Sequence, residues 1–252
     1  MSTNLDFSDL LRLIDERSTA FRAAIAAAPR LDVPVPTCPD WTLADLAQHL
    51  GEGRHRWAAT VAAGPADAPP DRSLWNTSAA PQDRAELLDW LAESAQRLID
   101  ALREAGPDRG CWTWWDTSQS PQTSGAVARH QVQEVALHTY DAQLTVGEAE
   151  PLPVEVALDG VDEFLSTCVA TTSPWPHDPA VVEYRTIEGQ SWTLHLSAAG
   201  ARVDRLAAPA DVSTESTAGE LVLTFYGRNP VEALKLDGDR RILDRLVAWE
   251  PE

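Results

Sequence analysis

The feature that most constrains the fold is a long stretch with almost no charge, residues 122–147. Only Arg129, Glu134 and Asp141 are charged within it, whereas 23% of the whole chain is charged. Its side chains recur at helical spacing, and a helix this poor in charge needs cover on more than one side. The stretch therefore predicts a buried helix over about residues 125–146, covered by neighbouring helices and by a second domain.

Three further helical patterns precede this one, separated by loops that contain proline. The first begins near Phe7 and carries leucine, isoleucine and phenylalanine at intervals of three and four residues. Four helices of similar length joined by loops are typical of an antiparallel four-helix bundle. We expect these three helices over about residues 7–28, 42–63 and 82–105.

From Pro151 the pattern changes to a mixture of helices and strands. Two runs with strand-like alternation flank the turn residues Glu188 and Gly189. The sequence thus predicts an α+β protein, with the helical bundle over residues 1–150 and a small α+β domain over residues 151–252. Within the second domain we expect strands at residues 180–187, 191–198 and 201–206, and helices at residues 154–170, 216–227 and 239–249.

The balance of charge limits the possible partners. The formal net charge is −19, and a surface this acidic repels phosphate backbones and anionic lipid headgroups. No apolar run reaches the roughly 18 residues of a membrane span, and the start MSTNLDFSDL lacks the basic end and apolar stretch of a secretory signal. We expect a cytoplasmic protein that acts on small molecules, with a monomer favoured over an oligomer.

The cysteines suggest neither a disulfide framework nor a cysteine zinc site. Cys38, Cys111 and Cys168 are odd in number, far apart and outside any paired spacing. We expect Cys111 to be a buried small apolar residue, because nothing near it in the sequence would lower its pKa. A metal ion, if bound, must therefore use other ligands.

The second helix carries a histidine beside its apolar stripe. Thr42 and Asp45 form a capping box that fixes the helix start, and Trp41 is placed to pack on Leu46. His49 follows three residues after Leu46, at the margin of the apolar stripe, so we expect it to point inward. A core histidine that is hydrogen-bonded to a carbonyl and a hydroxyl is the alternative to a functional residue.

The nearly uncharged fourth helix carries a stripe of potential ligands. His130, Glu134, His138 and Asp141 follow at spacings of four, four and three, which places them on one face. A polar stripe turned to water is one interpretation. A carboxylate in a covered helix, however, needs a partner or a cation. Glu134 and His138, joined by one inward imidazole from another helix, would form a His2Glu set of the kind that holds catalytic zinc.

Two segments together resemble a known family. CPDWTLADLAQHL with QEVALHTYDA resembles the DinB-like, mycothiol-dependent maleylpyruvate isomerase family of actinobacteria, a group of metal-dependent thiol transferases. The resemblance implies a DinB-like bundle in which His49, Glu134 and His138 bind zinc. It also relates AGELVLTFYGRNP to the family segment that brings an arginine to the substrate, here Arg228.

The resemblance implies mycothiol as thiol cosubstrate and an isomerisation or S-transfer on a small electrophile that carries a carboxylate. A zinc-bound thiol is deprotonated at neutral pH, and an arginine pairs well with a carboxylate. We expect Arg228 to act in catalysis and cofactor binding, although an arginine after the cap Gly227 is often only solvated. Trp114, with Trp112 and Trp115, would form a pocket wall or close the end of the bundle.

Several alternatives stay open. The metal could be another divalent ion such as nickel, and the protein could be a zinc hydrolase or a non-catalytic metal- and ligand-binding module. Asp141 could orient a ligand histidine or lie at the surface. We expect His130 at the rim of the site and His55 exposed between two arginines.

Overall fold

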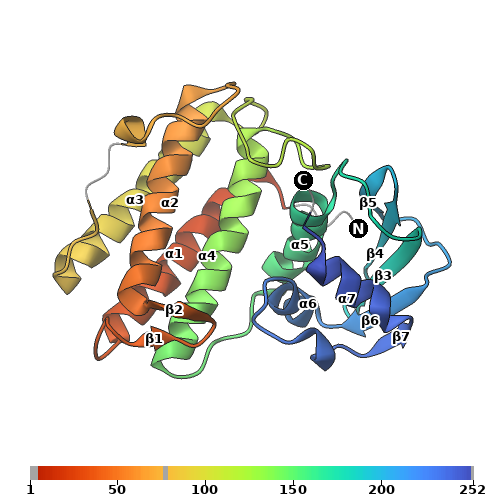
Figure 1. Ribbon diagram of the computed structural model, residues 1–252. Helices are drawn as coiled ribbons and strands as arrows, with labels where there is room; N and C mark the ends of the chain where they lie inside the picture. Colours follow the sequence, from red (N-terminus) through yellow and green to blue (C-terminus); the bar gives the residue numbers. More distant parts are fainter. Residues whose placement is uncertain (1–4, 76–78, 251–252) are drawn as a thin grey trace. The chain divides into compact units, whose positions relative to one another are not determined.

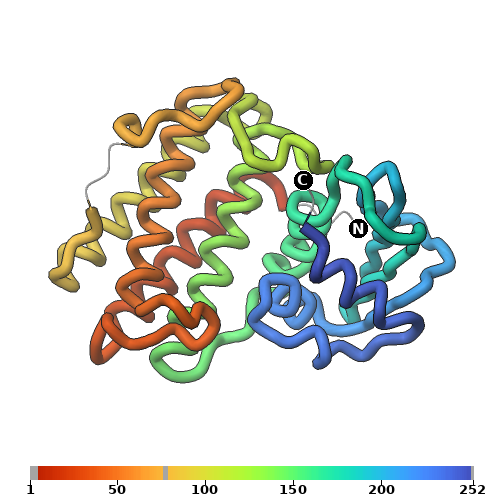
Figure 2. The backbone as a smooth tube through the Cα atoms, viewed as in Figure 1, coloured from red at the N-terminus to blue at the C-terminus, as the bar shows by residue number. Residues whose placement is uncertain are grey.

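The structure is a computed structural model that describes residues 5–75 and 79–250. It divides into two compact units, of which the first comprises Met1–Trp114 with Gln122–Leu152 and the second comprises Trp115–Pro121 with Pro153–Glu252. The expected classes are confirmed: a helical unit is followed by an α+β unit (Figures 1 and 2).

Four long helices lie alongside one another in the first unit (Figure 1). Each helix begins and ends within two residues of the predicted positions, because the apolar stripe of each helix extends to the capping residues at its ends. A short 3₁₀ turn, Arg72–Trp75, also belongs to this unit. The helices are α1 (Phe7–Ala27), α2 (Leu43–Ala63), α3 (Arg84–Ala105) and α4 (Ser124–Val146).

The start of α2 is fixed as the sequence predicts. The Thr42 hydroxyl accepts a hydrogen bond from the Asp45 backbone amide, and the Asp45 carboxylate accepts one from the Thr42 amide. A capping box of this kind satisfies two amides that the helix itself leaves without partners. The position of His49 along α2 is therefore set at its first turn.

The burial expected for the uncharged helix is confirmed. In α4, 15 of the 23 residues are buried, including polar residues such as Gln131, Gln133 and Asp141. The helix packs on α1, α2 and α3. Because covered positions exclude charge unless it is paired, this burial accounts for the composition of the segment.

A short hairpin that the sequence analysis did not predict precedes α2. Strand β1 (Pro34–Val35) pairs antiparallel with β2 (Cys38–Thr42). The prolines of this segment indicate a loop, and the pairing is too short to produce an alternating pattern. The hairpin places Thr37 and Trp41 beside the helices that carry the candidate ligands.

The second unit is built on a five-stranded sheet. Its strand order is β5-β4-β3-β6-β7, with β3 and β6 parallel and the other pairs antiparallel. The strands are β3 (Ala180–Thr186), β4 (Ser191–Ser197), β5 (Gly200–Asp204), β6 (Val212–Ser216) and β7 (Leu236–Gly238).

Helices α5, α6 and α7 accompany this sheet (Figure 1). The Trp192 indole of β4 donates to Asp162 of α5, and the Tyr184 ring of β3 meets Phe225 of α6 edge to face. The helices are α5 (Val154–Phe164), α6 (Ala218–Phe225) and α7 (Arg240–Ala248); a π-helical turn (Leu165–Val169) follows α5, and a 3₁₀ turn (Val231–Ala233) precedes β7.

Strands β6 and β7 were not predicted. The residues of β6 are mostly polar, and the strand exists because its backbone pairs in parallel with β3, a partner about 30 residues away in the chain. The predicted continuous helix over residues 154–170 is also corrected, since its last turn is π-helical.

The segment Trp115–Pro121 joins the second unit, whereas the predicted division at residue 150 assigned it to the first. Its Gln119 amide donates to the Ser166 carbonyl oxygen. The Gln119 side chain donates to the Val203 carbonyl and accepts from the Val203 amide, as another strand would. These bonds to β5 and to the turn after α5 cannot be read from local sequence.

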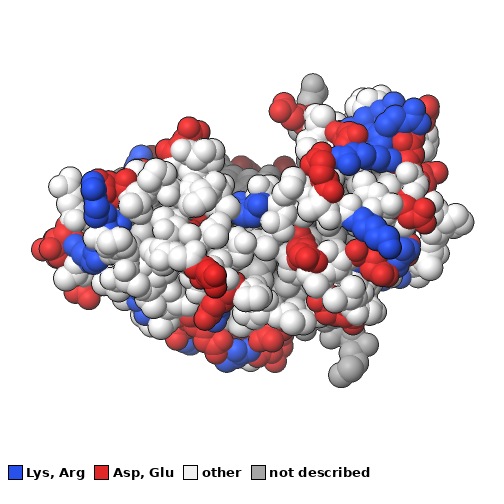
Figure 3. All heavy atoms as spheres, turned by 90° about the horizontal axis from the view of Figure 1, so that it is seen from below, with Lys and Arg blue, Asp and Glu red and all other residues white. Residues whose placement is uncertain are grey.

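Charge is distributed rather than gathered on the visible surface. Asp and Glu side chains are scattered over the face shown in Figure 3, with Lys and Arg among them. Within residues 5–75 and 79–250, every helix is too short or too polar to cross a membrane.

Candidate metal centre

Helices α2 and α4 bring three potential ligands together. His49 lies on α2, and Glu134 and His138 lie one turn apart on α4. Oε2 of Glu134 is 3.3 Å from Nε2 of His138 and 3.8 Å from Nε2 of His49. One donor atom from each of the three lies within 4.8 Å of the other two. The three residues that the sequence analysis singled out therefore converge on one point.

His138 is held in place by a buried carboxylate. Its Nδ1 atom lies 3.0 Å from Oδ2 of Asp141, which has no solvent exposure. The other oxygen of Asp141 accepts a hydrogen bond from the Thr37 hydroxyl at 2.6 Å. Asp141 therefore orients the imidazole and is not the surface carboxylate of the alternative interpretation. Thr37, which the sequence analysis missed, lies in the hairpin between β1 and β2.

The carboxylates and imidazoles of the cluster shift each other's pKa values toward the charged forms. Burial opposes ionisation of Glu134, but hydrogen bonds from His138 and His49 hold the pKa of its carboxyl well below the usual range. Burial alone would lower the pKa of His138, and hydrogen bonds to Asp141 and Glu134 raise it above the ordinary value. Glu134 is thus a carboxylate at neutral pH, which is the form that binds a cation.

His49 lies at the open side of the cluster. Its side chain is 44% exposed, so it is not a core histidine, but its Nε2 atom faces Glu134 of α4, as the expected inward direction requires. The Trp41 ring lies 4.6 Å from the His49 ring and 6.2 Å from that of His138. A tryptophan directly before the helix cap was expected to pack on Leu46; its ring contacts with both histidines were not foreseen.

His130 is a third imidazole beside Glu134 and lies deeper than the rim position expected for it. The residue is buried, and its Nε2 atom lies 3.8 Å from Oε1 of Glu134, whereas His49 and His138 contact Oε2. The rings of Trp57 and Trp114 lie edge-on to it at 6.2 and 5.8 Å.

The three tryptophans before α4 do not share one environment. Trp114 is 46% exposed and lies beside His130 in the first unit. Trp112 stacks at 6.3 Å on Trp57, which is buried. Trp115 is buried in the second unit and donates its indole N–H to the Pro121 carbonyl. Of the three, Trp114 has exposed aromatic surface, and it lies beside His130.

Arg228 belongs to the second unit, in the turn after α6. Gly227 adopts a positive φ of 73°, and the Arg228 amide donates to the Leu223 carbonyl oxygen. The Arg228 guanidinium donates to the Tyr226 carbonyl oxygen at 2.7 Å, and the Tyr226 hydroxyl donates to Glu163. The turn thus has the glycine cap that the sequence predicts, with the guanidinium folded back on its own backbone.

Two other expectations concern residues outside the cluster. His55 was expected to be exposed, but it is buried against the Trp90 ring at 5.7 Å, and burial lowers the pKa of its imidazole. The two flanking arginines misled this prediction, because Arg54 is also buried. Cys111 is buried as expected, and burial raises the pKa of its thiol to about 11.

The three ligands fit a divalent cation. Metal–nitrogen and metal–oxygen bonds of about 2.0–2.1 Å place tetrahedral ligands roughly 3.3 Å apart, close to the two separations at Glu134. Because Nδ1 of His138 faces a carboxylate, the proton of its neutral form belongs on Nδ1, and Nε2 is free to bind a metal. The donor set is that of His2Glu sites, which leave one position for a further ligand.

Comparison with known protein families matches both units. Residues 11–143 match the model of the mycothiol maleylpyruvate isomerase N-terminal domain, and residues 155–245 match that of the corresponding C-terminal domain. The chain belongs to the mycothiol maleylpyruvate isomerase family. The resemblance predicted from the sequence is confirmed, and the chain is a member of an enzyme family.

Solved structures share the fold of this family member. The crystal structure of the mycothiol-dependent maleylpyruvate isomerase has a TM-score of 0.61 at 13% identity, covering 92% of this chain and 93% of that one. A histidine-to-alanine mutant of that enzyme has a TM-score of 0.59 at the same identity and coverage. No curated protein sequence matches this chain significantly.

Proposed function

We propose that this member of the mycothiol maleylpyruvate isomerase family binds one divalent cation, zinc in the first instance, through His49, Glu134 and His138. The observation that carries the proposal is the convergence of these side chains on Oε2 of Glu134. A bound divalent cation would supply the positive charge that keeps a coordinated thiol deprotonated at neutral pH.

We propose mycothiol as the thiol, from the family to which the chain belongs. A thiolate adds to the activated double bond of a small electrophile, which turns that bond into a single bond about which the adduct rotates. Expulsion of the thiolate from the enolate adduct then gives the isomer, whereas protonation of the enolate carbon by solvent retains the thioether and gives S-transfer. Ligand sites are usually lined by aromatic side chains, and Trp114, which is exposed beside His130, is our candidate for such a wall.

Arg228 is our candidate for the residue that holds the substrate carboxylate. A guanidinium binds a carboxylate with two parallel hydrogen bonds and stabilises the negative charge that an enolate develops. In the structure, Nη1 of Arg228 donates to the Tyr226 carbonyl.

The test is a thiol-dependent assay with maleylpyruvate, which occurs in the name of the solved structures. Activity should require both mycothiol and the metal, disappear on chelation and return with zinc. Arg228→Lys keeps the charge and loses the two-bond geometry, so KM should rise roughly tenfold while metal content is unchanged. Activity that persists without any thiol would instead indicate a metal-dependent hydrolase.

A further inference from the structure

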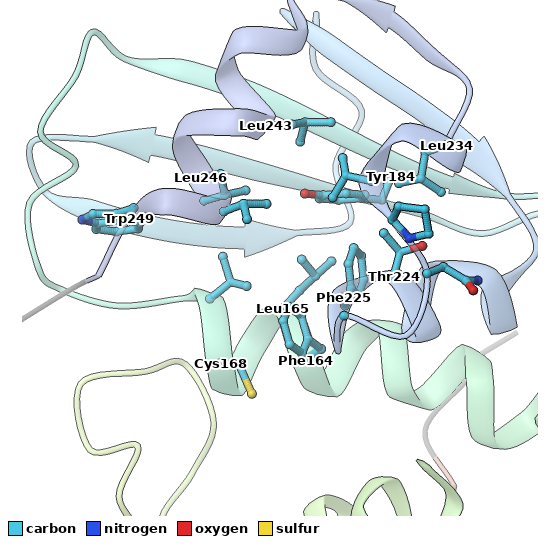
Figure 4. A pocket seen from close by; sticks show the side chains of 16 residues that line it. Phe164, Leu165, Cys168, Tyr184, Thr224, Phe225, Leu234, Leu243, Leu246 and Trp249 are labelled. Carbon is cyan, nitrogen blue, oxygen red and sulfur yellow. The ribbon is translucent and has the colours of Figure 1, made fainter. Parts of the chain in front are cut away.

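The second unit contains a cavity of about 490 Å³ (Figure 4). Its walls come from the end of α5 and the following π-helical turn, from β3, from α6 and the loop after it, and from α7. A volume of this size lies in the range of about 300–1,000 Å³ that is typical of small-molecule sites. All of its lining residues belong to the second unit, and none of them is a candidate metal ligand.

The lining of the cavity is apolar and carries no ionisable acid or base other than a thiol and a phenol. None of its described residues is Asp, Glu, Lys, Arg or His. One wall is a series of aromatic rings: Phe164 stacks on Phe225 at 4.9 Å, and Phe225 meets Tyr184 edge to face at 5.1 Å. Such walls favour flat, neutral molecules and exclude a carboxylate, which would remain unpaired there.

Two hydroxyl groups on the cavity wall form no hydrogen bond within the described part of the chain, and that of Thr224 is buried. Thr224 is 6% exposed, and its Oγ1 atom is buried without a partner. Tyr184 is 4% exposed, its oxygen lies at the cavity in Figure 4, and its hydroxyl takes part in none of the hydrogen bonds between residues 5–75 and 79–250. Leaving a buried hydroxyl without a partner is unfavourable, so the Thr224 hydroxyl favours an incoming hydrogen-bond partner, and the Tyr184 hydroxyl is available to a ligand in the cavity.

We propose that this cavity is a second ligand site, which binds a neutral, largely apolar ring compound carrying one hydrogen-bond acceptor such as a ketone. The ring system packs on the wall formed by Phe164, Phe225 and Tyr184. Its acceptor receives a hydrogen bond from the Tyr184 or Thr224 hydroxyl. The site goes beyond the proposed function, because its ligand is uncharged whereas the proposed substrate carries a carboxylate.

The probe for the test is prodan, a neutral naphthalene with one ketone whose emission shifts to shorter wavelength in apolar surroundings. Added to the full chain with zinc present, it should bind saturably at one site per chain. The naphthalene sulfonate ANS, which has a similar ring and a negative charge, should bind at least about tenfold more weakly, because nothing in the cavity pairs its charge.

Variants locate the binding. Leu246→Trp places a large ring on the cavity wall contributed by α7 and should abolish prodan binding. Leu206→Trp is the matched control, because Leu206 is 71% exposed and lies outside the cavity lining, and it should leave binding unchanged. Tyr184→Phe and Thr224→Val each remove one hydroxyl with little change in volume, and one of them should weaken binding about fivefold.

Three results would overturn the proposal: an absence of saturable prodan binding, equal binding by Leu246→Trp and the wild type, or no weakening by either hydroxyl variant. If Leu246→Trp does not fold, as judged by its melting transition, prodan binding by Tyr184→Phe and Thr224→Val tests the proposal instead, because these two variants change the volume little. None of these variants alters the proposed metal ligands, so metal content and thiol-dependent activity provide an independent reference.

Discussion

The imidazole of His138 lies between two carboxylates, with its Nδ1 atom 3.0 Å from Asp141 and its Nε2 atom 3.3 Å from Glu134. The first contact fixes the ring and its tautomer, and the second directs the free nitrogen to the point that His49 also approaches. The account of this site depends on that arrangement, and the predictions below test it.

Asp141→Asn should weaken metal binding without removing a ligand. The amide cannot stabilise the imidazole as a carboxylate does, so we expect the affinity for zinc to fall about 10- to 100-fold. The measurement is a competitive titration against a chromogenic chelator. Asp89→Asn, an exposed position on α3, is the matched control and should leave the affinity unchanged. Equal affinities of the two variants would show that Asp141 does not support the site.

Metal affinity should rise with pH. Without metal, the pKa of His138 is raised above its ordinary value, so a proton competes for Nε2 at neutral pH. The apparent affinity should increase about tenfold per pH unit until the pH exceeds that pKa. In Asp141→Asn this increase should level off at lower pH, because the hydrogen bond that most strongly raises the His138 pKa is lost. A pH-independent affinity between about pH 6 and 8 would contradict the prediction.

The stability of the metal-free protein should fall as the pH rises. A histidine with a raised pKa stabilises the folded state fully below the unfolded-state pKa, and this contribution is lost as the pH rises through the folded-state pKa. The difference in melting temperature between zinc-loaded and chelator-treated protein should therefore widen from about pH 6 to pH 8. A difference that narrows over this range would indicate that His138 is not the titrating ligand.

His130→Phe should retain the metal. His49 and His138 approach Oε2 of Glu134, whereas His130 approaches Oε1. A phenyl ring keeps the contacts with Trp57 and Trp114 while removing the nitrogen. We expect zinc content within experimental error of the wild type by elemental analysis. A loss of zinc as complete as that expected for His138→Phe would make His130 a ligand.

Arg54→Met should stabilise the fold. The Arg54 guanidinium is buried, and no carboxylate lies within ion-pair distance of it in the described part of the chain. Burial lowers the pKa of Arg54 to about 9, which shows that the fold disfavours its charge. An apolar side chain of similar length should raise the free energy of unfolding by about 1–4 kcal/mol at pH 7, measured by urea denaturation.

Arg103→Met is the control for this effect, since Arg103 is exposed and forms only a surface ion pair with Asp100. Its free energy of unfolding should change by less than about 0.5 kcal/mol. If Arg54→Met destabilises the protein by several kcal/mol, the buried guanidinium has a stabilising role that its hydrogen bond to Ser18 does not explain.

Local patterns in the sequence predict the helices of the first unit and the three candidate ligands. The stripe of α4 and the capping box at Thr42 depend only on residues within one helix, so their spacing is visible in the sequence. Features that depend on distant partners were missed or misplaced. Strand β6 exists through its pairing with β3, and Thr37 reaches Asp141 across 104 positions of the chain.

Burial of individual polar residues was the least predictable property. His49 is exposed and His55 is buried, the reverse of what their neighbours indicate. His49 lies at the margin of an apolar stripe, where a small rotation of the helix decides how much of the side chain is exposed, whereas His55 was misjudged from its two flanking arginines. The same margin position leaves His49 accessible on one side while its Nε2 atom faces Glu134.

The most direct test of the central claim is the metal content of purified wild-type protein beside that of His49→Ala, measured by elemental analysis after zinc loading and desalting. Gln48→Ala, an exposed neighbour on the same helix, is the control. We predict about one zinc per chain in the wild type and in Gln48→Ala, and almost none in His49→Ala. A metal-free wild type, or His49→Ala with full zinc content, would contradict the account.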